Sequence, residues 1–213
     1  LLLTRLIWKM KPDIVHVSGG AWQIKGVLAG RLAGRKVIWH LNDTQTPKVL
    51  KLFFRAVQPF AHAFITAGYR VQEYYLKNEV KRQIFNISAP VDCSVFDPAL
   101  IKKTHSDNVL RIITVANINP IKGLEQFLEM AAKLNQKVFK PLEFRIIGPV
   151  FDSQILYFKK LKELTKKLKL KNLVFVGGIE DVREELANAD IFECTSVSEA
   201  SPTSVWEAMA LGK

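Results

Sequence analysis

Two glutamates near the end of the sequence are spaced so that they could hold one ligand between them. Glu199 follows an apolar segment, and Glu207 falls about one turn into a predicted helix that begins after Pro202. The free N–H groups at a helix start bind anions, and carboxylates accept hydrogen bonds from hydroxyl groups. The pair therefore suits a ligand with hydroxyl groups at both ends and an anion in the middle. Alternatively, Glu207 only complements the helix dipole and Glu199 is a surface charge.

Hydroxyl side chains and a lysine lie beside two predicted helix starts. We expect Thr203 or Ser204 to cap the helix that contains Glu207. A second candidate anion site is Lys122-Gly123, directly before another predicted helix, where the ammonium and backbone N–H groups would meet phosphate oxygens. A solvent-exposed lysine beside a turn glycine is the competing interpretation. A nucleotide sugar, with its ribose, diphosphate and hexose, has the layout that the two glutamates suit.

Short apolar segments rich in Val, Ile and Phe recur along the chain and precede these candidate groups. Near-continuous hydrophobicity is typical of strands that are covered on both faces of a parallel sheet. Ligands of such sheets bind beyond the carboxyl ends of the strands. This rule selects the loops after Val17, His40, Val115, Ile147, Val176 and Thr195. The predicted strands are residues 13–17, 36–40, 63–66, 83–87, 111–115, 144–147, 173–176 and 190–194.

Segments with helical spacing alternate with the strands, which predicts right-handed crossovers and doubly wound α/β sheets. A polar stretch without periodicity, from Pro98 to Asn108, interrupts the pattern. We therefore expect two domains, residues 1–98 and 109–213, joined by a linker at 99–108. The predicted helices are residues 124–134, 155–169, 182–189 and 203–211, and residues 1–10 have the pattern of an amphipathic helix.

Composition excludes several classes of protein. With 213 residues, 48% of them hydrophobic, the chain can form a core, and its two cysteines cannot make a disulfide framework. No apolar run reaches the roughly 18–20 residues of a membrane-spanning helix. The net charge is +11, with a dense lysine run at 159–171. A solvated helix surface, an anionic membrane and nucleic acid could each explain that run, but no nucleic-acid motif accompanies it, so we expect no nucleic-acid partner.

Several motifs together resemble those of the GT-B, family 4 retaining glycosyltransferases. The segment from Glu199 to Glu207 is similar to the E-x7-E signature of that family. The resemblance covers nearly the whole chain, and its C-terminal half is the more specific part. The other similar stretches are 11–17 (KPDIVHV), 89–98 (APVDCSVFDP), 115–123 (VANINPIKG), 172–177 (NLVFVG) and 189–192 (ADIF).

The resemblance implies a fold and a set of roles. The fold would consist of two Rossmann-like, doubly wound parallel-sheet domains, both incomplete in this fragment. Glu199 and His40 would contact the transferred sugar, Glu207 the ribose, and Lys122 the diphosphate, where it would neutralise the departing group. A packed imidazole is the alternative for His40. Further donor contacts would come from Asn117, Gly123, Ile179 at the base, and the backbone amides of Thr203 and Ser204.

Two residues depart from the family pattern. Asn117 stands where the family has an arginine, so a bidentate guanidinium contact to phosphate is lost unless Arg111 or another cation replaces it. Ala200 replaces a glycine after the first glutamate. The chain contains no Asp-x-Asp sequence and no zinc-ligand spacing. We therefore expect the reaction to be independent of metal and of any cofactor, with the nucleoside-diphosphate sugar as substrate.

The resulting functional hypothesis is transfer of a sugar, with retention, from a nucleoside-diphosphate donor to a glycan or lipid-linked acceptor in polysaccharide biosynthesis. The expected location is the cytoplasm, with association at the inner face of the membrane. We expect the 213-residue chain alone to be poorly active, because both domains are predicted to be incomplete. Two alternatives stay open: a non-catalytic basic module that binds anionic membranes, and a nucleotide-sugar epimerase with the same fold.

Overall fold

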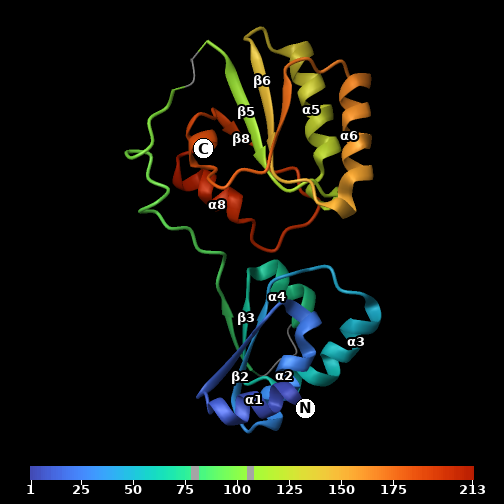
Figure 1. The fold of residues 1–213 in the computed structure, drawn as a ribbon, viewed down its shortest axis with the longest axis vertical. Helices are drawn as coiled ribbons and strands as arrows, with labels where there is room; N and C mark the ends of the chain where they lie inside the picture. The colour runs from blue at the N-terminus through green and yellow to red at the C-terminus, as the bar shows by residue number, and fades with distance from the viewer. Residues whose placement is uncertain (78–81, 105–107) are drawn as a thin grey trace. The chain divides into compact units, whose positions relative to one another are not determined.

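The structure is a computed structural model that describes residues 1–77, 82–104 and 108–213. The chain divides into two compact units, each built on its own parallel sheet (Figure 1). The first unit contains Leu1–Ala89 together with Glu199–Ser201, and the second contains Pro90–Ser198 together with Pro202–Lys213. Residues 90–98, predicted to lie in the first domain, thus group with the second unit. Residues 105–107 of the predicted linker lie outside the described residues.

The sheet of the first unit has four parallel strands in the order β1-β2-β3-β4, the same order as in the sequence. Right-handed crossovers that all advance in one direction place every connecting helix on the same face of a sheet. All four strands confirm the strands predicted in this half. Their bounds are β1 Ile14–Ser18, β2 Lys36–Leu41, β3 Ala63–Thr66 and β4 Gln83–Asn86.

The hydrophobic core of the first unit lies on that one face. Trp39 and Phe64 of the sheet are fully buried there, and the Trp39 and Phe54 ring centroids are 4.7 Å apart. Alternate residues of the strands point to the opposite face, where Ile14 and Phe85 are about half exposed. The helices of this unit are α1 Leu2–Met10, α2 Ile24–Leu32, α3 Lys48–Val57 and α4 Tyr69–Tyr75.

Three of these helices were not predicted from the sequence. Helix α2 carries Gly26 and Gly30, where a β-carbon would approach Val17 and Val37, so close packing on the sheet outweighs low helix propensity. Helix α4 is rich in aromatic residues, which are weak helix formers, and its burial of Val71 and Tyr75 stabilises it instead.

The second unit also has four parallel strands, but their order is β7-β6-β5-β8. From β5 the chain advances through β6 to β7 and then returns to the other side of β5. The predicted strands in this half are confirmed, although β8 is shorter than residues 190–194 because only two residues pair regularly with β5. Their bounds are β5 Leu110–Val115, β6 Leu142–Ile147, β7 Leu173–Gly177 and β8 Ile191–Phe192.

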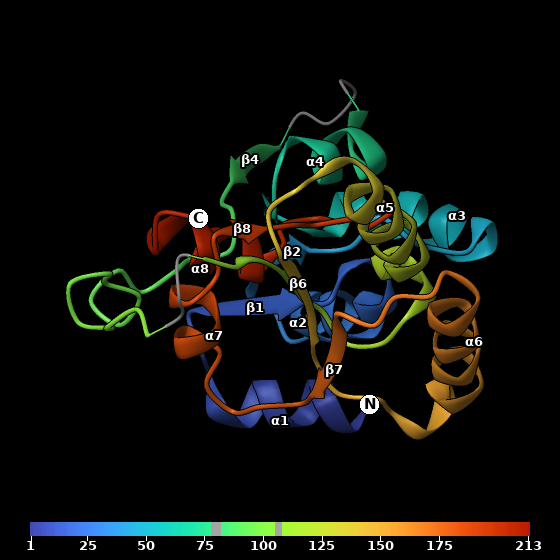
Figure 2. The ribbon, with the colours of Figure 1, turned by 90° about the horizontal axis from the view of Figure 1, so that it is seen from above.

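This reversal covers both faces of the second sheet. One core cluster packs α5 and α6 against Ile112 and Phe144, and another packs α8 against Ile113 and Ile147. Figure 2 shows α5 and α6 on one side of these strands and α7 and α8 on the other. All four helices confirm predicted ones. Their bounds are α5 Leu124–Lys137, α6 Ile155–Lys167, α7 Arg183–Ala187 and α8 Thr203–Ala210.

Candidate functional site

The strand order of the second unit marks one position for a ligand. The connection that leaves β5 crosses one face of the sheet, and the connection that enters β8 crosses the other. Loops therefore diverge at the carboxyl ends of β5 and β8, and open α/β sheets bind ligands at such a switch point. The loop after β5 carries Lys122 and Gly123, and the segment after β8 leads to Glu199. The first sheet has no such reversal among its described strands.

Two hydrogen bonds to backbone carbonyl groups hold the loop after β5 against the loop after β8. The Thr195 hydroxyl donates to the carbonyl oxygen of Lys122 over 3.2 Å, and the Val197 N–H donates to that of Ile121 over 2.9 Å. Asn119 stabilises the turn through its side-chain oxygen, which accepts the Ile121 N–H at 3.1 Å. Lys122 is thereby fixed at the end of a short 3-10 turn, with α5 beginning directly after it.

Gly123 is required at its position for two reasons. Its φ is +61°, a left-handed conformation that side chains disfavour, and an added β-carbon would lie 2.1 Å from the carbonyl oxygen of Thr195. Only glycine therefore lets the two loops approach this closely. Its sequence position beside Lys122 predicts a phosphate contact for Gly123, whereas this packing role depends on Thr195, 73 residues beyond Lys122.

A second close approach joins the loops after β5, β6 and β7. A β-carbon on Gly148 would lie 2.2 Å from the carbonyl oxygen of Ala116, and the Gly148 N–H donates to Gly177 over 2.8 Å. The Ala116 N–H in turn donates to Ile147 over 2.8 Å. The loops that contain Gly148 and follow Thr195 were predicted, but no role was predicted for either residue. The position of Gly148, directly after a predicted strand, is the sequence feature that could have indicated a close approach.

Helix α8 begins differently from the prediction. Pro202 is the N-cap residue, and no side chain caps the helix, so the expectation that Thr203 or Ser204 caps it is wrong. Both residues already lie inside the helix, where their hydroxyl groups are not in the capping position. In the part of the chain that the structure describes, the backbone N–H groups of Thr203 and Ser204 have no hydrogen-bond acceptor. These two donors are therefore available to an anion.

Glu207 lies one turn into α8 and is half-buried. Within the described ranges, its carboxylate has no hydrogen bond and no ion pair, and burial raises the pKa of this group. A half-buried carboxylate without a cation costs stability at neutral pH. Such a group is typical of a site that binds a hydroxyl-bearing ligand, because hydroxyl donors would satisfy its oxygens.

The remaining predicted residues of the second unit lie at the same end of the sheet. Asn117 and Lys122 follow β5 and are half-buried, and Ile179 follows β7 with 39% of its surface exposed. Arg111 does not replace the missing arginine of the family pattern. It lies near the amino end of β5, where its guanidinium is 3.0 Å from Glu143. That suggestion is wrong because the strand carries Arg111 to the opposite edge of the sheet.

The first unit contributes His40 at the carboxyl end of β2. His40 and His16 of β1 lie on the open face of the sheet, with ring centroids 5.5 Å apart and nearly parallel planes. Burial and the nearby His16 lower the pKa of His40, so its imidazole is neutral near pH 7. A neutral imidazole can both donate and accept a hydrogen bond to a sugar hydroxyl. Glu199, which is half-buried, belongs to the segment that groups with this unit.

Side chains organise the carboxyl-end loops of the first unit. The Tyr75 hydroxyl donates to Asp43 over 2.5 Å, and the Thr46 hydroxyl donates to the same oxygen over 3.2 Å. The indole N–H of Trp39 donates to the carbonyl oxygen of Gly20 over 2.9 Å. The loops after β1 and β2 are thus connected through Asp43, Tyr75 and Trp39.

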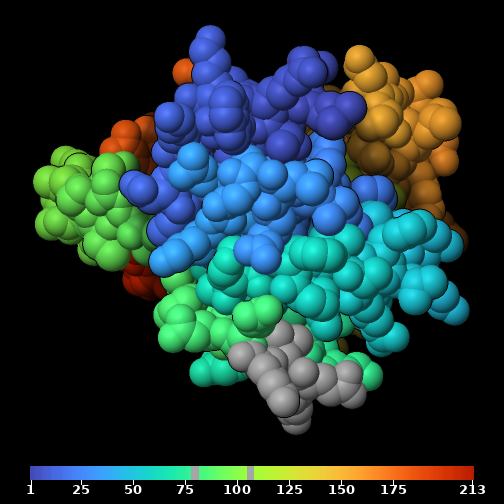
Figure 3. Space-filling model, turned by 90° about the horizontal axis from the view of Figure 1, so that it is seen from below, coloured from blue at the N-terminus to red at the C-terminus, as the bar shows by residue number. Residues whose placement is uncertain are grey.

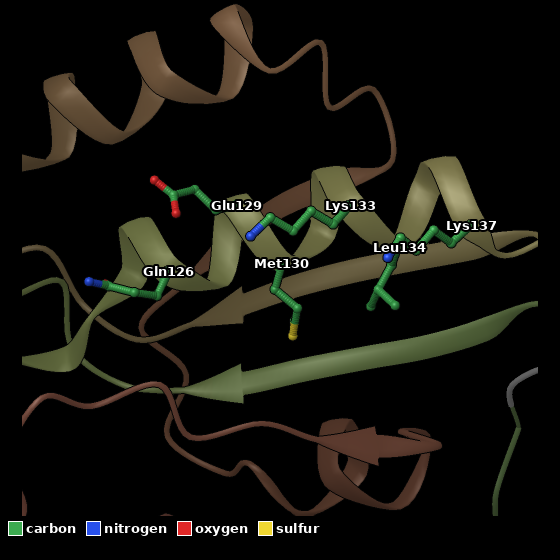
Figure 4. A pocket seen from close by; sticks show the side chains of 6 residues that line it. All are labelled: Gln126, Glu129, Met130, Lys133, Leu134 and Lys137. Carbon is green, nitrogen blue, oxygen red and sulfur yellow. The ribbon is translucent and has the colours of Figure 1, made fainter.

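A groove elsewhere on the second unit does not match this chemistry. Its lining residues all come from α5, and in Figure 4 Met130 points toward the strands while Glu129 points away from them. One helix supplies no converging groups from a second element, so we assign no site there. Among the described residues, no helix is long and apolar enough to cross a membrane, and no cluster of His, Cys, Asp and Glu could hold a metal ion.

Known proteins resemble this chain in sequence and in fold. The chain is 26% identical to the UDP-Gal:alpha-D-GlcNAc-diphosphoundecaprenol alpha-1,3-galactosyltransferase of Escherichia coli, over 99% of this chain and 58% of that protein. The structure is similar to Anabaena Alr3699/HepE in complex with UDP and glucose, with a TM-score of 0.81, 16% identity, and coverage of 100% of this chain and 61% of that one. It is also similar to a glycosyltransferase from Rickettsia africae, with a TM-score of 0.81, 21% identity, and coverage of 100% of this chain and 59% of that one.

These relatives confirm the predicted GT-B class of fold, and the chain spans about six-tenths of their length. The profile of the family described as glycosyl transferases group 1 matches residues 97–213, which include the loops after β5 to β8 and all of α8. By that match, this chain belongs to the glycosyl transferases group 1 family.

Proposed function

We propose that the protein transfers a sugar, with retention of configuration, from a nucleoside-diphosphate donor to a lipid-linked glycan acceptor at the cytoplasmic face of a membrane. The observation that carries this proposal is the switch point of the second sheet. There Lys122, two free amide donors of α8 and the unpaired Glu207 belong to loops and a helix that follow β5 and β8. The relative from Escherichia coli, whose name gives a UDP-sugar and a diphosphoundecaprenol acceptor, supports the substrate classes.

Each residue has a distinct role in the proposed reaction. Lys122, the amides of Gly123, Thr203 and Ser204, and the Asn117 side chain stabilise the diphosphate as it departs. Glu207 accepts hydrogen bonds from the ribose hydroxyls, and Ile179 packs against the base. Glu199 and the neutral His40 hold the hydroxyls of the sugar. The charge that develops on the diphosphate is met by these donors alone, so the reaction proceeds without a metal or cofactor.

Titration calorimetry with UDP and GDP tests the donor site. Glu207→Gln should weaken nucleotide binding at least about tenfold, because one neutral amide replaces an acceptor of two ribose hydroxyls. The same variant should raise thermal stability slightly, because it removes a half-buried, unpaired carboxylate. Unchanged nucleotide affinity in Glu207→Gln would contradict the role of this residue. Glu129→Gln, on the exposed surface of α5, is the matched control and should change neither quantity.

Product analysis tests the class of reaction. Sugar should be released to product only when an acceptor is present, whereas an epimerised nucleotide sugar formed without acceptor would contradict glycosyl transfer. The isolated 213-residue chain should turn over poorly, since it spans about six-tenths of its relatives. Substantial turnover by that chain alone would refute this expectation.

A further inference from the structure

The net positive charge of the protein is concentrated in the first unit. Residues 1–89 contain 14 Lys and Arg residues and 4 Asp and Glu residues, a net charge of +10 out of +11 for the chain. Residues 90–213 contain 17 basic and 16 acidic residues, and one of these acids, Glu199, groups with the first unit, so the net charge is +9 for the first unit and +2 for the second. The lysine run of α6 is therefore balanced by acidic residues elsewhere in the second unit, whereas the basic residues of the first unit are not.

Helix α3 carries three stripes of side chains, of which only one faces the core. Leu50, Phe54 and Val57 pack against the sheet, at the i, i+4, i+7 spacing of one helix face. A basic stripe and an apolar stripe lie side by side on the rest of the helix. The basic stripe is Lys48, Arg55 and the half-buried Lys51, whose ammonium lies 3.7 Å from the Tyr74 ring centroid. The apolar stripe is Val49, Leu52 and Phe53, which are 68%, 67% and 57% exposed.

The apolar stripe of α3 takes no part in the core of the unit. A surface helix of a globular protein places polar residues on its outer face, and α3 instead exposes two large side chains next to its cations. Phe60, just after the helix, is a further exposed aromatic at 44%. Apolar residues beside Lys and Arg on one helix are typical of a helix that lies in the interface of an anionic membrane.

A second group of cations lies beside the end of α3. The Arg31 guanidinium lies 3.0 Å from Nε2 of His62. Burial lowers the pKa of the His62 imidazole, and the charges of Arg31, Arg82 and Lys36 lower it further. The Arg82 guanidinium also donates to the carbonyl oxygen of Pro59, in the turn that follows α3, over 3.2 Å. Within the described ranges, none of these four side chains forms an ion pair with a carboxylate. Figure 3 shows segments 30–40 and 48–60 exposed side by side on one face.

A hollow at the same end of α3 places one further cation, Lys77, beside Arg55 of the basic stripe. It is lined by Arg55, Gln58 and Lys77, with Tyr74 and Tyr75 beside them. Its polar lining and its two cations match a phosphate group. We name the apolar stripe of α3, its basic stripe and the His62 cations together the α3 face.

We propose that the α3 face docks the protein on an anionic lipid bilayer, with Leu52 and Phe53 in the interfacial region and the surrounding cations on lipid phosphates. This inference rests on the proposed function, because a lipid-linked acceptor requires the enzyme at a membrane. It locates the docking surface on α3, although the lysine run of α6 is the denser basic segment. On α6 the exposed large apolar side chains are Ile155 and Leu156, both in its first turn, and the lysines that follow have no exposed apolar stripe beside them. Such a lysine surface attracts an anionic membrane without inserting along the helix.

Vesicle co-sedimentation of the protein tests the docking surface. Vesicles of phosphatidylglycerol and phosphatidylethanolamine should bind the protein, and binding should fall steeply with salt and be weak on phosphatidylcholine alone. The variant L52S/F53S should lower partitioning about tenfold or more through lost apolar burial, and K48E/R55E by a similar factor through charge. The matched controls on α6, L156S and K159E/K166E, should each change it less than about threefold.

The outcomes separate the docking surface from the donor site. Unchanged vesicle binding in L52S/F53S, or equal losses in the α6 controls, would overturn the proposal. A dimer in vesicle-free solution that L52S/F53S dissociates would assign the stripe to a second copy and would also overturn it. All variants should bind UDP like the unmodified protein. If UDP does not bind while vesicle docking persists, the proposed function fails and the docking surface stands.

Discussion

The two units use the same kind of sheet but differ in how its strands are ordered. In the first unit the strands follow one another in sequence, so the core occupies one face and Ile14, His16 and Phe85 stay exposed on the other. In the second, the return of the chain to β8 covers both faces and creates the switch point. The difference shows that strand order, rather than strand composition, decides where a parallel sheet can bind a ligand.

The units also differ in how their carboxyl-end loops are fastened. In the second unit, backbone carbonyls approach Gly123 and Gly148 too closely for any side chain. In the first unit, the corresponding role falls to side chains, chiefly Asp43 and Tyr75. Gly20 has φ +62° and a β-carbon position 2.0 Å from an Asp43 carboxylate oxygen. Gly20 and Gly123 therefore share a left-handed conformation and a close approach at the β-carbon position. They differ in the group that approaches, a side-chain carboxylate at Gly20 and a backbone carbonyl at Gly123.

The largest expected effect comes from that pair. Gly123→Ala should lower the free energy of unfolding of the second unit by about 3–4 kcal/mol, because left-handed strain adds to a clash with a backbone carbonyl that cannot rotate away. Gly20→Ala should cost the first unit about 1–2 kcal/mol, because the Asp43 carboxylate can turn aside. Urea denaturation measures both. Equal costs in the two variants would contradict the distinction between backbone and side-chain fastening.

An intermediate effect is expected at Asp43. Asp43→Ala should cost about 2 kcal/mol, because it leaves the hydroxyl groups of Tyr75 and Thr46 without their acceptor. In the double variant Gly20→Ala/Asp43→Ala, the steric conflict disappears. Its loss of stability should therefore be smaller than the sum of the losses in the two single variants. Strict additivity in this double-mutant cycle would show that Asp43 does not oppose Gly20 in solution.

The first half of the chain also shows the limits of sequence reading. Its four strands are predictable because their apolar runs are continuous, but α2, α3 and α4 are not. The stripes of α3 mix apolar and basic residues around the helix, so no single polar face marks it. In the second half, Glu199, Glu207 and Lys122 could be selected from their spacing around predicted helix starts. The contact between Gly123 and Thr195 could not, because it depends on which strand pairs with β5.

The smallest expected effect concerns the pH dependence of the first unit. The pKa of His40 is lowered in the folded state, so the unfolded chain binds more protons just below the usual histidine pKa of about 6.5. Stability of this unit should therefore rise with pH through that interval and level off above it. His16→Gln removes one of the two causes, so the pKa of His40, followed by NMR titration, should rise while burial still holds it below its usual value. An unchanged pKa of His40 in this variant would contradict electrostatic coupling between the two rings.

The hydrogen bond between Thr195 and Lys122 has a consequence for folding during translation. A ribosome adds about 5–20 residues per second, so the loop after β5 emerges several seconds before the residue that fastens it, 73 positions later. During this delay the edge of β5 that later pairs with β8 is unpaired, although the strand itself is among the most apolar of the chain. Translational pausing between these two codons would lengthen the time for which this apolar edge stays unpaired.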